Sequence, residues 1–309
     1  MTHPVNDFSM DHSTFEPQFE SLRLIVENSL RRTAEVNQSH AQVLKQAMEY
    51  SLFARAKRIR PILALQAGKL FGARQEKILD IVVAIEHLHT YSLIHDDLPC
   101  MDDTDYRRGI ETCHKKFGED IATLAGDALL TLAWDTIIVR SREQGFSDKV
   151  IVDLIAILSR AIGADGMIAG QVLDLQAEKK KSSLKEVSEI HEYKTGKLFV
   201  GSLQVGGVLA GASEMELKLL SDFGEHFGMV FQITDDILDL TGTTESLGKP
   251  QGSDLALEKS TVPSVLGIDK SRILAKQHVT MGKDLLSSIG SPEARFLQNL
   301  MDYLLVRTS

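Results

Sequence analysis

Two aspartate-rich segments contain the residues of this chain that are best suited to chemistry. The first, "HDDLPCMDDTDYRRG", places five aspartates between Asp96 and Asp105, and two arginines follow. The second, "QITDDILDL", carries Asp235, Asp236 and Asp239 among apolar residues. Residues four apart share one face of a helix, so Asp235 and Asp239 are neighbours whose like charges repel. Uncompensated carboxylates in apolar surroundings are costly, and a hard divalent cation such as Mg²⁺ supplies the compensation.

The spacing within the first segment predicts a turn. Asp96 and Asp102 are six positions apart, which on a straight helix separates them by about 240° around the axis. Pro99 lies between them and opposes continuation of a helix. We therefore expect the chain to turn near Pro99 and to bring Asp102 back beside Asp96. Either acidic segment alone is also typical of a solvated helix end, but the pair favours two metal-binding motifs.

Basic residues elsewhere in the chain predict an anionic ligand for these metals. Arginine binds phosphate through two hydrogen bonds, and lysine binds it as a point charge. The candidate phosphate-binding side chains are Lys57, Arg60, Arg107, Arg108, Lys194, Lys249 and Lys259. His89 lies seven positions before Asp96, on the same face of a helix, so both can line one cavity. The sequence contains neither a Walker A nor a G-x-G-x-x-G motif, and the pattern indicates a diphosphate site instead of a nucleotide site.

Composition limits the classes of protein to which the chain can belong. Its 309 residues, 43% of them apolar, are ample for a large hydrophobic core. A net charge of −9 argues against binding to nucleic acid. Two cysteines, Cys100 and Cys113, are too few for a disulfide framework and favour a reducing compartment. The N-terminus does not resemble a signal peptide, and no uninterrupted apolar run reaches about 18 residues. We expect a soluble, cytoplasmic protein without stable membrane insertion.

Helical periodicity dominates the chain, and strand signals are nearly absent. Residues 81–95 and 225–240 are apolar nearly all round, which is typical of helices that are buried on every side. We therefore expect an all-α fold, a large single-domain helical bundle with a central cavity, over residues 17–309. Residues 1–16 are polar and are expected to form a flexible N-terminal arm. The polar stretch 246–263 is the longest expected loop, and loops of this length are usually functional.

The two aspartate motifs resemble those of the short-chain trans-isoprenyl diphosphate synthases, most closely the bacterial farnesyl diphosphate synthases. The flanking segments "KRIRP", "TCHKKFGE", "LAGDALL", "AGQVLDL" and "KTGKL" also match blocks of that family. The resemblance covers roughly residues 20–305. It implies the isoprenoid synthase type of helical bundle and a homodimer. It also implies head-to-tail condensation of isopentenyl diphosphate with an allylic diphosphate, dimethylallyl or geranyl, with release of pyrophosphate.

The resemblance also implies a role for each candidate residue. Mg²⁺, three ions per active site with Mn²⁺ able to substitute, is held by Asp96, Asp102 and Asp235, with Asp97 and Asp239 as outer or secondary ligands. The allylic diphosphate is held by Arg107, Lys194 and Lys259. Isopentenyl diphosphate is held by Lys57, Arg60, His89 and Arg108. Thr195 and Gln232, with Lys194, lie where the family stabilises the developing carbocation. Lys249 belongs to the loop that we expect to close over the diphosphates.

Product length and the class of enzyme leave alternatives open. Tyr91, five positions before Asp96, and the two extra residues in "LPCM" resemble the farnesyl (C15) form, and the neighbouring Ser92 is small. Geranylgeranyl (C20) relatives share "LPCMDD", so a geranylgeranyl diphosphate synthase is the first alternative. A class I terpene cyclase usually carries one such motif and needs no isopentenyl site. A catalytically silent partner subunit typically loses one or both motifs, whereas both are intact here.

Overall fold

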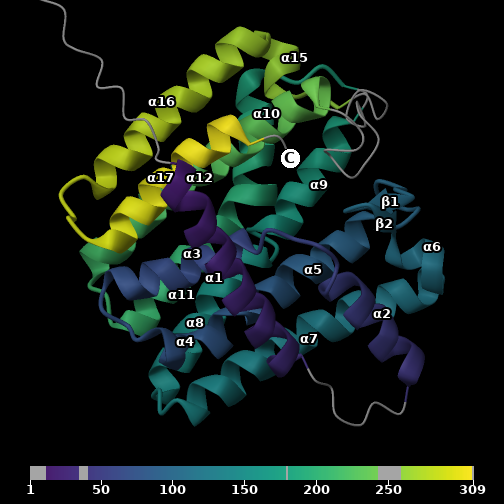
Figure 1. The fold of residues 1–309 in the computed structure, drawn as a ribbon. Helices are drawn as coiled ribbons and strands as arrows, with labels where there is room; N and C mark the ends of the chain where they lie inside the picture. The colour runs from purple at the N-terminus through teal and green to yellow at the C-terminus, as the bar shows by residue number, and fades with distance from the viewer. Residues whose placement is uncertain (1–11, 35–40, 179, 243–258, 308–309) are drawn as a thin grey trace, which may run out of the picture.

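Helices make up nearly all of the computed structural model, which describes residues 12–34, 41–178, 180–242 and 259–307 (Figure 1). This confirms the all-α, single-domain fold. The helices are α1 His12–Thr33, α2 Gln42–Leu52, α3 Ile59–Leu70, α4 Gln75–Val82, α5 Ala84–Asp96, α6 Cys113–Phe117, α7 Glu119–Glu143, α8 Asp148–Ile162, α9 Met167–Ala177, α10 Leu184–His191, the π-helical η1 Glu192–Gly196, α11 Lys197–Ala210, α12 Glu214–Thr241, α15 Val262–Leu266, α16 Ile268–Leu286 and α17 Pro292–Val306.

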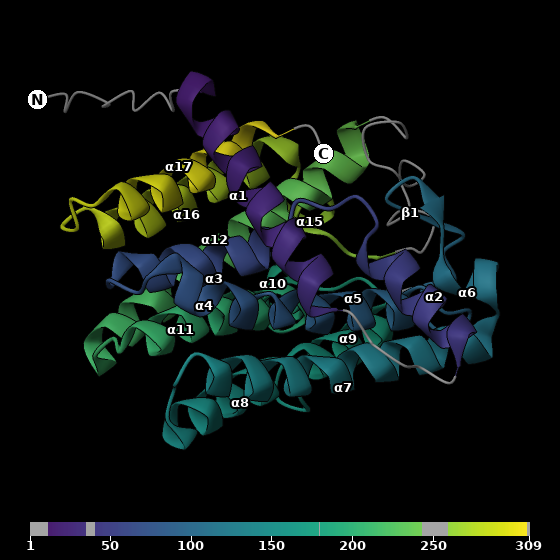
Figure 2. The ribbon, with the colours of Figure 1, turned by 60° about the horizontal axis from the view of Figure 1, so that its bottom comes forward.

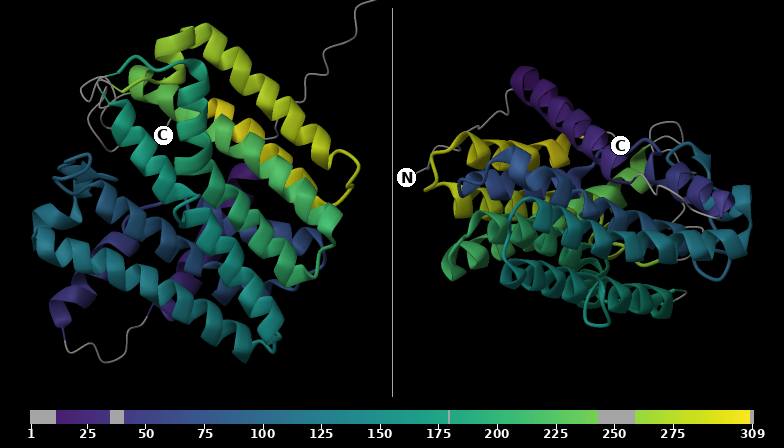
Figure 3. Two further views of the ribbon diagram at one scale, coloured as in Figure 1. Left: turned by 180° about the vertical axis from the view of Figure 1, so that it is seen from behind. Right: turned by 90° about the horizontal axis from the view of Figure 1, so that it is seen from below.

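The helices are stacked in layers. The α7–α8 pair forms one outer layer, and α16 and α17 lie on the opposite side of the molecule (Figure 2). The same order is seen from the other directions in Figure 3. Between these layers run α3, α5, α11 and α12, with α5 packed on α7 and α12 packed on α16. The helices that bear the two aspartate motifs, α5 and α12, are therefore both central.

The central position of α5 and α12 confirms the expectation for the nearly all-apolar stretches. Leu88 of α5 and Phe227 of α12 are both completely buried, as are most of their apolar neighbours. One detail differs, because Val83 interrupts the first stretch and separates α4 from α5. Both helices also bury polar side chains, Glu86 of α5 and Asp236 and Asp239 of α12, which require partners within the protein.

Small residues bring α3 and α11 into backbone contact. A Cβ atom added at Gly206 of α11 would lie 2.0 Å from the carbonyl oxygen of Ala64, and one at Gly68 of α3 would lie 3.2 Å from the carbonyl oxygen of Gly206. No larger side chain fits at Gly206 without separating the two helices. The close packing fixes the start of α3, where Arg60 lies, against the centre of the bundle.

The N-terminal helix begins before the expected boundary at residues 16 and 17. Helix α1 starts at His12, and Phe15 is only 1% exposed because it packs against Phe19, Phe296 and Tyr303. Residues 1–11 lie outside the described part of the chain, so a flexible arm remains a prediction.

A two-stranded hairpin is the exception to the helical pattern in the described residues. Strand β1, Tyr106–Arg107, pairs antiparallel with β2, Ile110–Glu111. Arg108 and Gly109 form the turn with φ angles of 56° and 81°. Two residues at positive φ are typical of the tightest hairpin turns, where glycine is favoured because it has no Cβ atom. The hairpin fixes the directions of Arg107 and Arg108 directly after the first aspartate motif.

Helix α7 modifies the expectation about membranes. Among the described residues it is one helix that is long and apolar enough to cross a bilayer, judged by length and composition alone. The expectation that no apolar stretch could span a bilayer was based on uninterrupted apolar runs, and α7 is apolar on average although polar residues interrupt it. Core helices of soluble proteins pass the same test, and α7 packs along α5 and α2.

The expected loop 246–263 falls mostly on residues 243–258, which lie outside the described part of the chain. Lys249 is among them, so its predicted role remains a prediction. The chain is described again from Lys259, and α15 begins at Val262, within the stretch that was expected to be loop.

Candidate active site

The expected turn after α5 is present. Helix α5 ends at Asp96, and the backbone N–H of Asp102 donates a hydrogen bond to the carbonyl oxygen of Asp96 over 2.9 Å. A second bond, from the N–H of Met101 to the carbonyl oxygen of Leu98 at 2.8 Å, closes the turn around Pro99. Asp102 is thus folded back beside Asp96, as the spacing predicted.

Asp96 lies among cations. Its Oδ1 atom is 3.5 Å from Nζ of Lys194, and its Oδ2 atom is 3.5 Å from Nη2 of Arg107. The amide of Gln171 also donates to Oδ1. Burial raises the pKa of Asp96, but the positive charges of Lys194 and Arg107 lower it by more than burial raises it. The pKa therefore lies below its usual value. The carboxyl is therefore held in its charged form, which is the form that binds a metal.

Asp174 connects two of the predicted lysines. Lys194 and Lys259 both donate to its Oδ2 atom, at 2.6 and 3.0 Å, and Lys259 also donates to Oδ1 of Asp102 at 3.0 Å. Burial lowers the pKa of Lys259, but these two carboxylates raise it by more, so the pKa lies above its usual value. Both Asp174 and Gln171 were missed in the sequence analysis. Their signal was two polar side chains three positions apart in the apolar "AGQVLDL" segment of α9.

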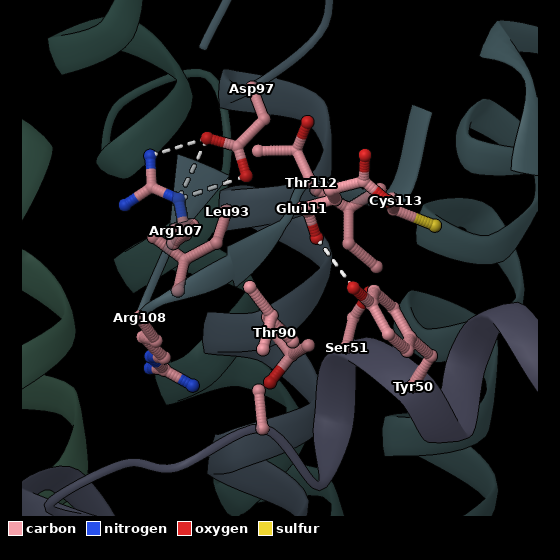
Figure 4. Close-up of a pocket in the computed structure, with 13 residues that line it drawn as sticks. Tyr50, Ser51, Thr90, Leu93, Asp97, Arg107, Arg108, Glu111, Thr112 and Cys113 are labelled. Carbon is pink, nitrogen blue, oxygen red and sulfur yellow. Dashed lines mark hydrogen bonds and ion pairs between the residues drawn. The ribbon is translucent and has the colours of Figure 1, made fainter. Parts of the chain in front are cut away.

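Asp97 contacts Arg107 and Thr104. The Nε atom of Arg107 donates to both carboxylate oxygens, at 2.7 and 2.9 Å (Figure 4). The Thr104 hydroxyl donates to Oδ1 at 2.6 Å. Asp97 is only 3% exposed. In this structure Asp97 therefore orients Arg107, whose other end reaches Asp96.

The aspartates of the second motif have unequal exposure. The side chain of Asp235 is 45% exposed, whereas Asp236 and Asp239 are each 2% exposed. Arg307, which the sequence analysis did not select, donates to Oδ1 of Asp235 at 3.3 Å and to the carbonyl oxygen of Phe231 at 2.9 Å. Burial raises the pKa of Asp236 to about 7. The face of α12 that is open to a ligand therefore presents Asp235.

A second group of cations lies near the start of α3. Nη1 of Arg60 is 3.2 Å from Nε2 of His89, which confirms that these two side chains lie together. Burial lowers the pKa of Arg60 to about 10 and that of Arg108 to about 10, and burial with the charge of Arg307 lowers the pKa of Lys57 to about 8. Burial lowers these three pKa values by more than the nearby carboxylates raise them, and a bound anion would stabilise the positive charges.

The predicted cations therefore divide into two electrostatic groups. Arg107, Lys194 and Lys259 have pKa values raised by the carboxylates beside them, despite burial. Arg60, Arg108 and Lys57 have lowered pKa values. The first group matches a site shared by metals and an anion, and the second matches a site for an anion alone.

Thr195 and Gln232 are in direct contact. The Thr195 hydroxyl donates to Oε1 of Gln232 over 3.0 Å. Thr195 and Lys194 both lie on the single turn of π-helix, η1, a deviation that frequently occurs at functional sites. A Cβ atom added at Gly170 of α9 would lie 2.0 Å from the backbone nitrogen of Lys194, so only glycine permits this approach. The close contact fixes where η1 directs both side chains.

The pocket in Figure 4 adjoins this region. It is lined by Thr90, Leu93, Asp97, Arg108 and Glu111 among others. Arg108 therefore borders both this pocket and the second group of cations.

The donor set suits magnesium. Within the described ranges, no three histidine, cysteine, aspartate or glutamate side chains are grouped closely enough to hold a metal ion by themselves. Mg²⁺ typically takes one or two carboxylates and completes its shell with water and substrate phosphates. The pair Asp96 and Asp102 and the exposed Asp235 supply oxygen donors of that kind, and no soft ligand lies among them.

Comparison with known proteins assigns the family. The family model described as polyprenyl synthetase matches residues 41–284, so the chain belongs to the polyprenyl synthetase family. It is a prenyltransferase of isoprenoid biosynthesis, as the motifs predict.

Two curated relatives and one solved structure illustrate the similarity. The chain is 42% identical to the farnesyl diphosphate synthase of Bacillus subtilis (strain 168) over 264 residues, 85% of this chain and 88% of that protein. It is 41% identical to the chloroplastic geranylgeranyl pyrophosphate synthase of Capsicum annuum over 283 residues, 91% and 76% of the two chains. The geranyltransferase of Helicobacter pylori, solved with magnesium and isoprenyl diphosphate, superposes with a TM-score of 0.81 at 33% identity, over 96% of this chain and 98% of that chain.

Proposed function

We propose that this chain condenses isopentenyl diphosphate head-to-tail with dimethylallyl diphosphate and then geranyl diphosphate. The product is farnesyl diphosphate, and pyrophosphate is released in each step. The observation that carries the proposal is the division of the buried cations into two groups, one with pKa values raised by adjacent carboxylates and one with pKa values lowered by burial. Two diphosphates must be bound side by side, and only the allylic one must lose its diphosphate.

The allylic diphosphate is assigned to the carboxylate-rich group. Asp96, Asp102 and Asp235 would hold Mg²⁺, three ions per active site with Mn²⁺ able to substitute, and Asp239 would act as a secondary ligand. Bound Mg²⁺ supplies Lewis-acid stabilisation of the charge on the leaving diphosphate. Lys194, Lys259 and Arg107 bind the same diphosphate, and Asp97 fixes Arg107 through its bidentate contact. Lys249 is proposed to approach from the adjoining loop.

Isopentenyl diphosphate is assigned to the second group, Lys57, Arg60, His89 and Arg108. Arg60 rests over the Phe199 ring at 4.3 Å, which holds its guanidinium group while leaving its edge available to a phosphate. Thr195 and Gln232 present oxygen dipoles, which stabilise positive charge that develops on the allyl group. No side chain is assigned as a general base, and the departing diphosphate takes the final proton.

Tyr91 supports the farnesyl product. It is 5% exposed, lies in the core between α5 and its neighbours, and contacts the edge of His95 with ring centres 5.8 Å apart. A large side chain on this wall limits the length of the prenyl chain that fits. Geranylgeranyl diphosphate is the alternative product, because relatives of both kinds are about equally similar.

A homodimer and a cytoplasmic location are part of the proposal. Exposed apolar side chains occur on α7, α8 and α9, at Leu124, Val139, Val152, Ile168 and Val172. Such residues are typical of a subunit interface, and light scattering at micromolar protein tests the dimer. We also propose that residues 17–309 form the catalytic domain, together with the first residues of α1 from His12 onward.

Product analysis tests the function. The purified protein is incubated with isopentenyl and dimethylallyl diphosphates and Mg²⁺, and the dephosphorylated products are separated by chromatography. A dominant C15 alcohol is expected. A dominant C20 alcohol would assign the alternative synthase. A cyclic hydrocarbon formed from geranyl diphosphate alone, without isopentenyl diphosphate, would assign a cyclase. No turnover with either allylic substrate would identify a silent subunit.

A further inference from the structure

Asp236 is the buried middle aspartate of the second motif, and no role has been assigned to it above. Its Oδ1 atom accepts a hydrogen bond from Nε2 of Gln232 at 3.0 Å, and its Oδ2 atom accepts one from the backbone N–H of Val262 at 3.0 Å. Nε2 of His191 lies 3.5 Å from Oδ2. Both carboxylate oxygens are therefore engaged by the protein itself, and the side chain is 2% exposed.

The first of these contacts orients the amide of Gln232. With its NH₂ group on Asp236, Gln232 must turn its carbonyl oxygen the other way, toward Thr195. The Thr195 hydroxyl donates to that oxygen at 3.0 Å. Asp236 thus determines which end of the Gln232 amide faces Thr195.

The second contact fixes the start of α15. Val262 is the first residue of that helix, so its N–H has no partner within the helix. The Val262 side chain is completely buried in a small apolar cluster with Val187, Ile233, Ile237 and Ala275. Asp236 therefore anchors the backbone of Val262, the residue at which the chain re-enters the buried core at the start of α15.

That point lies three residues after Lys259. Three residues span at most about 10 Å, so the anchor at Val262 limits where the lysine can be. Lys259 reaches Asp102 and Asp174 at 3.0 Å each. Ser260 adds a contact with Ser182 and Lys180, at the exposed side of the same segment.

We propose that Asp236 is a positioning residue, not a metal ligand. It holds Lys259 at the allylic diphosphate through Val262, and it orients the Thr195–Gln232 pair through Gln232. The inference rests on the proposed function for its kinetic consequences, but the anchoring itself is a property of the folded chain.

Two variants separate the contacts. Asp236→Ala removes both. Val262→Pro leaves the bond from Gln232 in place and removes the bond from the backbone N–H, together with the buried valine side chain. Proline is tolerated at the first position of a helix, and Thr261 before it is already extended, with φ −118° and ψ 163°. Asp235→Ala is the comparison for a lost metal ligand, and Asp222→Ala, elsewhere on α12, controls for the helix.

Kinetics and amide exchange then test the proposal. Asp236→Ala is expected to raise the KM for the allylic diphosphate about tenfold and to lower kcat, with the apparent activation constant for Mg²⁺ changed far less than in Asp235→Ala. Val262→Pro should raise the allylic KM alone. In a Lys259→Ala background the KM effect of Asp236→Ala should fall below about twofold, because the two changes remove one interaction. Hydrogen exchange at Val262 should accelerate at least about tenfold in Asp236→Ala.

Two results would overturn the proposal. One is a shift of the Mg²⁺ activation constant in Asp236→Ala as large as that in Asp235→Ala, which would make Asp236 a ligand. The other is unchanged exchange at Val262, which would show that Asp236 is no anchor. The exchange measurement requires no turnover, so it tests the anchor at Val262 even if the protein does not catalyse the condensation. Absence of condensation would refute the proposed function and would leave the exchange test valid. If Asp236→Ala does not fold, the Val262→Pro kinetics decide the question.

Discussion

Lys259 and Asp102 are 157 positions apart in the sequence, and Nζ of the lysine lies 3.0 Å from Oδ1 of the aspartate. This ion pair joins the segment before α15 to the turn after α5. Asp174 of α9 shares the same lysine, so three distant parts of the chain converge on one ammonium group. The charged centre of the candidate site is thus assembled by tertiary packing, and its components can be tested separately.

Loss of a first-motif carboxylate should disable the reaction. Asp96→Asn removes a proposed Mg²⁺ ligand while keeping the size of the side chain, and turnover is expected to fall by several orders of magnitude. Chelation of the metal should abolish activity in the wild type. Asp105→Asn is the control, because Asp105 is exposed and pairs with Lys115. Near-normal turnover of Asp96→Asn with saturating Mg²⁺ would contradict the assignment.

Lys57 should make isopentenyl diphosphate binding depend on pH. Its pKa is lowered to about 8 by burial and by the charge of Arg307. The ammonium group is therefore charged below pH 8 and neutral above it, so the KM for isopentenyl diphosphate should rise as the pH passes through 8. Lys57→Arg should remove this inflection, because arginine keeps its charge. Steady-state kinetics from pH 7 to 9.5 measure the effect, and an identical inflection in Lys57→Arg would exclude Lys57 as its source.

Gly170 should be indispensable for the geometry of η1. In Gly170→Ala the new Cβ atom meets backbone at 2.0 Å, so α9 and η1 must move apart and Lys194 and Thr195 must shift. A displacement of about 1 Å at reacting groups can reduce turnover about 100-fold. Gly196→Ala is the matched control at the other end of η1, where the nearest atom is 3.6 Å away. Equal turnover of the two variants would show that the close contact has no catalytic consequence.

Arg58 should stabilise the fold strongly. It is fully buried and donates to Glu86 at 2.7 Å, to Glu27 at 2.8 Å and to the carbonyl oxygen of Leu52 at 2.6 Å. Arg58→Met removes the hydrogen-bonded cation from the buried Glu86, so the free energy of unfolding should fall by about 3–5 kcal/mol. Lys149→Ala breaks an exposed ion pair with Asp153 and should change the free energy of unfolding by less than about 0.5 kcal/mol. Denaturant unfolding compares them, and similar losses would contradict the prediction.

Tyr91 should limit product length. Tyr91→Ala removes a buried ring from the wall of α5, and longer products than those of the wild type are expected because the prenyl chain gains room. Chromatography of the dephosphorylated products gives the distribution. Should the distribution stay unchanged, the floor of the pocket lies elsewhere, with Leu88 one turn earlier as the next candidate.

Local patterns predicted the elements of the site better than they predicted its connections. Pro99 and the six-residue spacing were sufficient to predict the turn that returns Asp102 to Asp96, because both act within one turn of chain. Asp174 and Arg307 were missed, because their importance comes from partners 85 and 72 positions away. The π-helical turn that carries Lys194 was also not predicted, since it depends on the contact with Gly170 of another helix.

The pairing of Lys194 and Lys259 with carboxylates has a thermodynamic consequence. The same lysines are assigned to the allylic diphosphate, and two of their carboxylate partners, Asp96 and Asp102, are assigned to the metal. Entry of a metal–diphosphate complex would therefore be an exchange of partners, in which each ammonium group passes from carboxylate to phosphate and Asp96 and Asp102 pass from ammonium to metal. Either ligand alone would break these ion pairs and leave one side uncompensated. Mg²⁺ and diphosphate should thus bind with positive cooperativity, each raising the affinity of the other by the same factor.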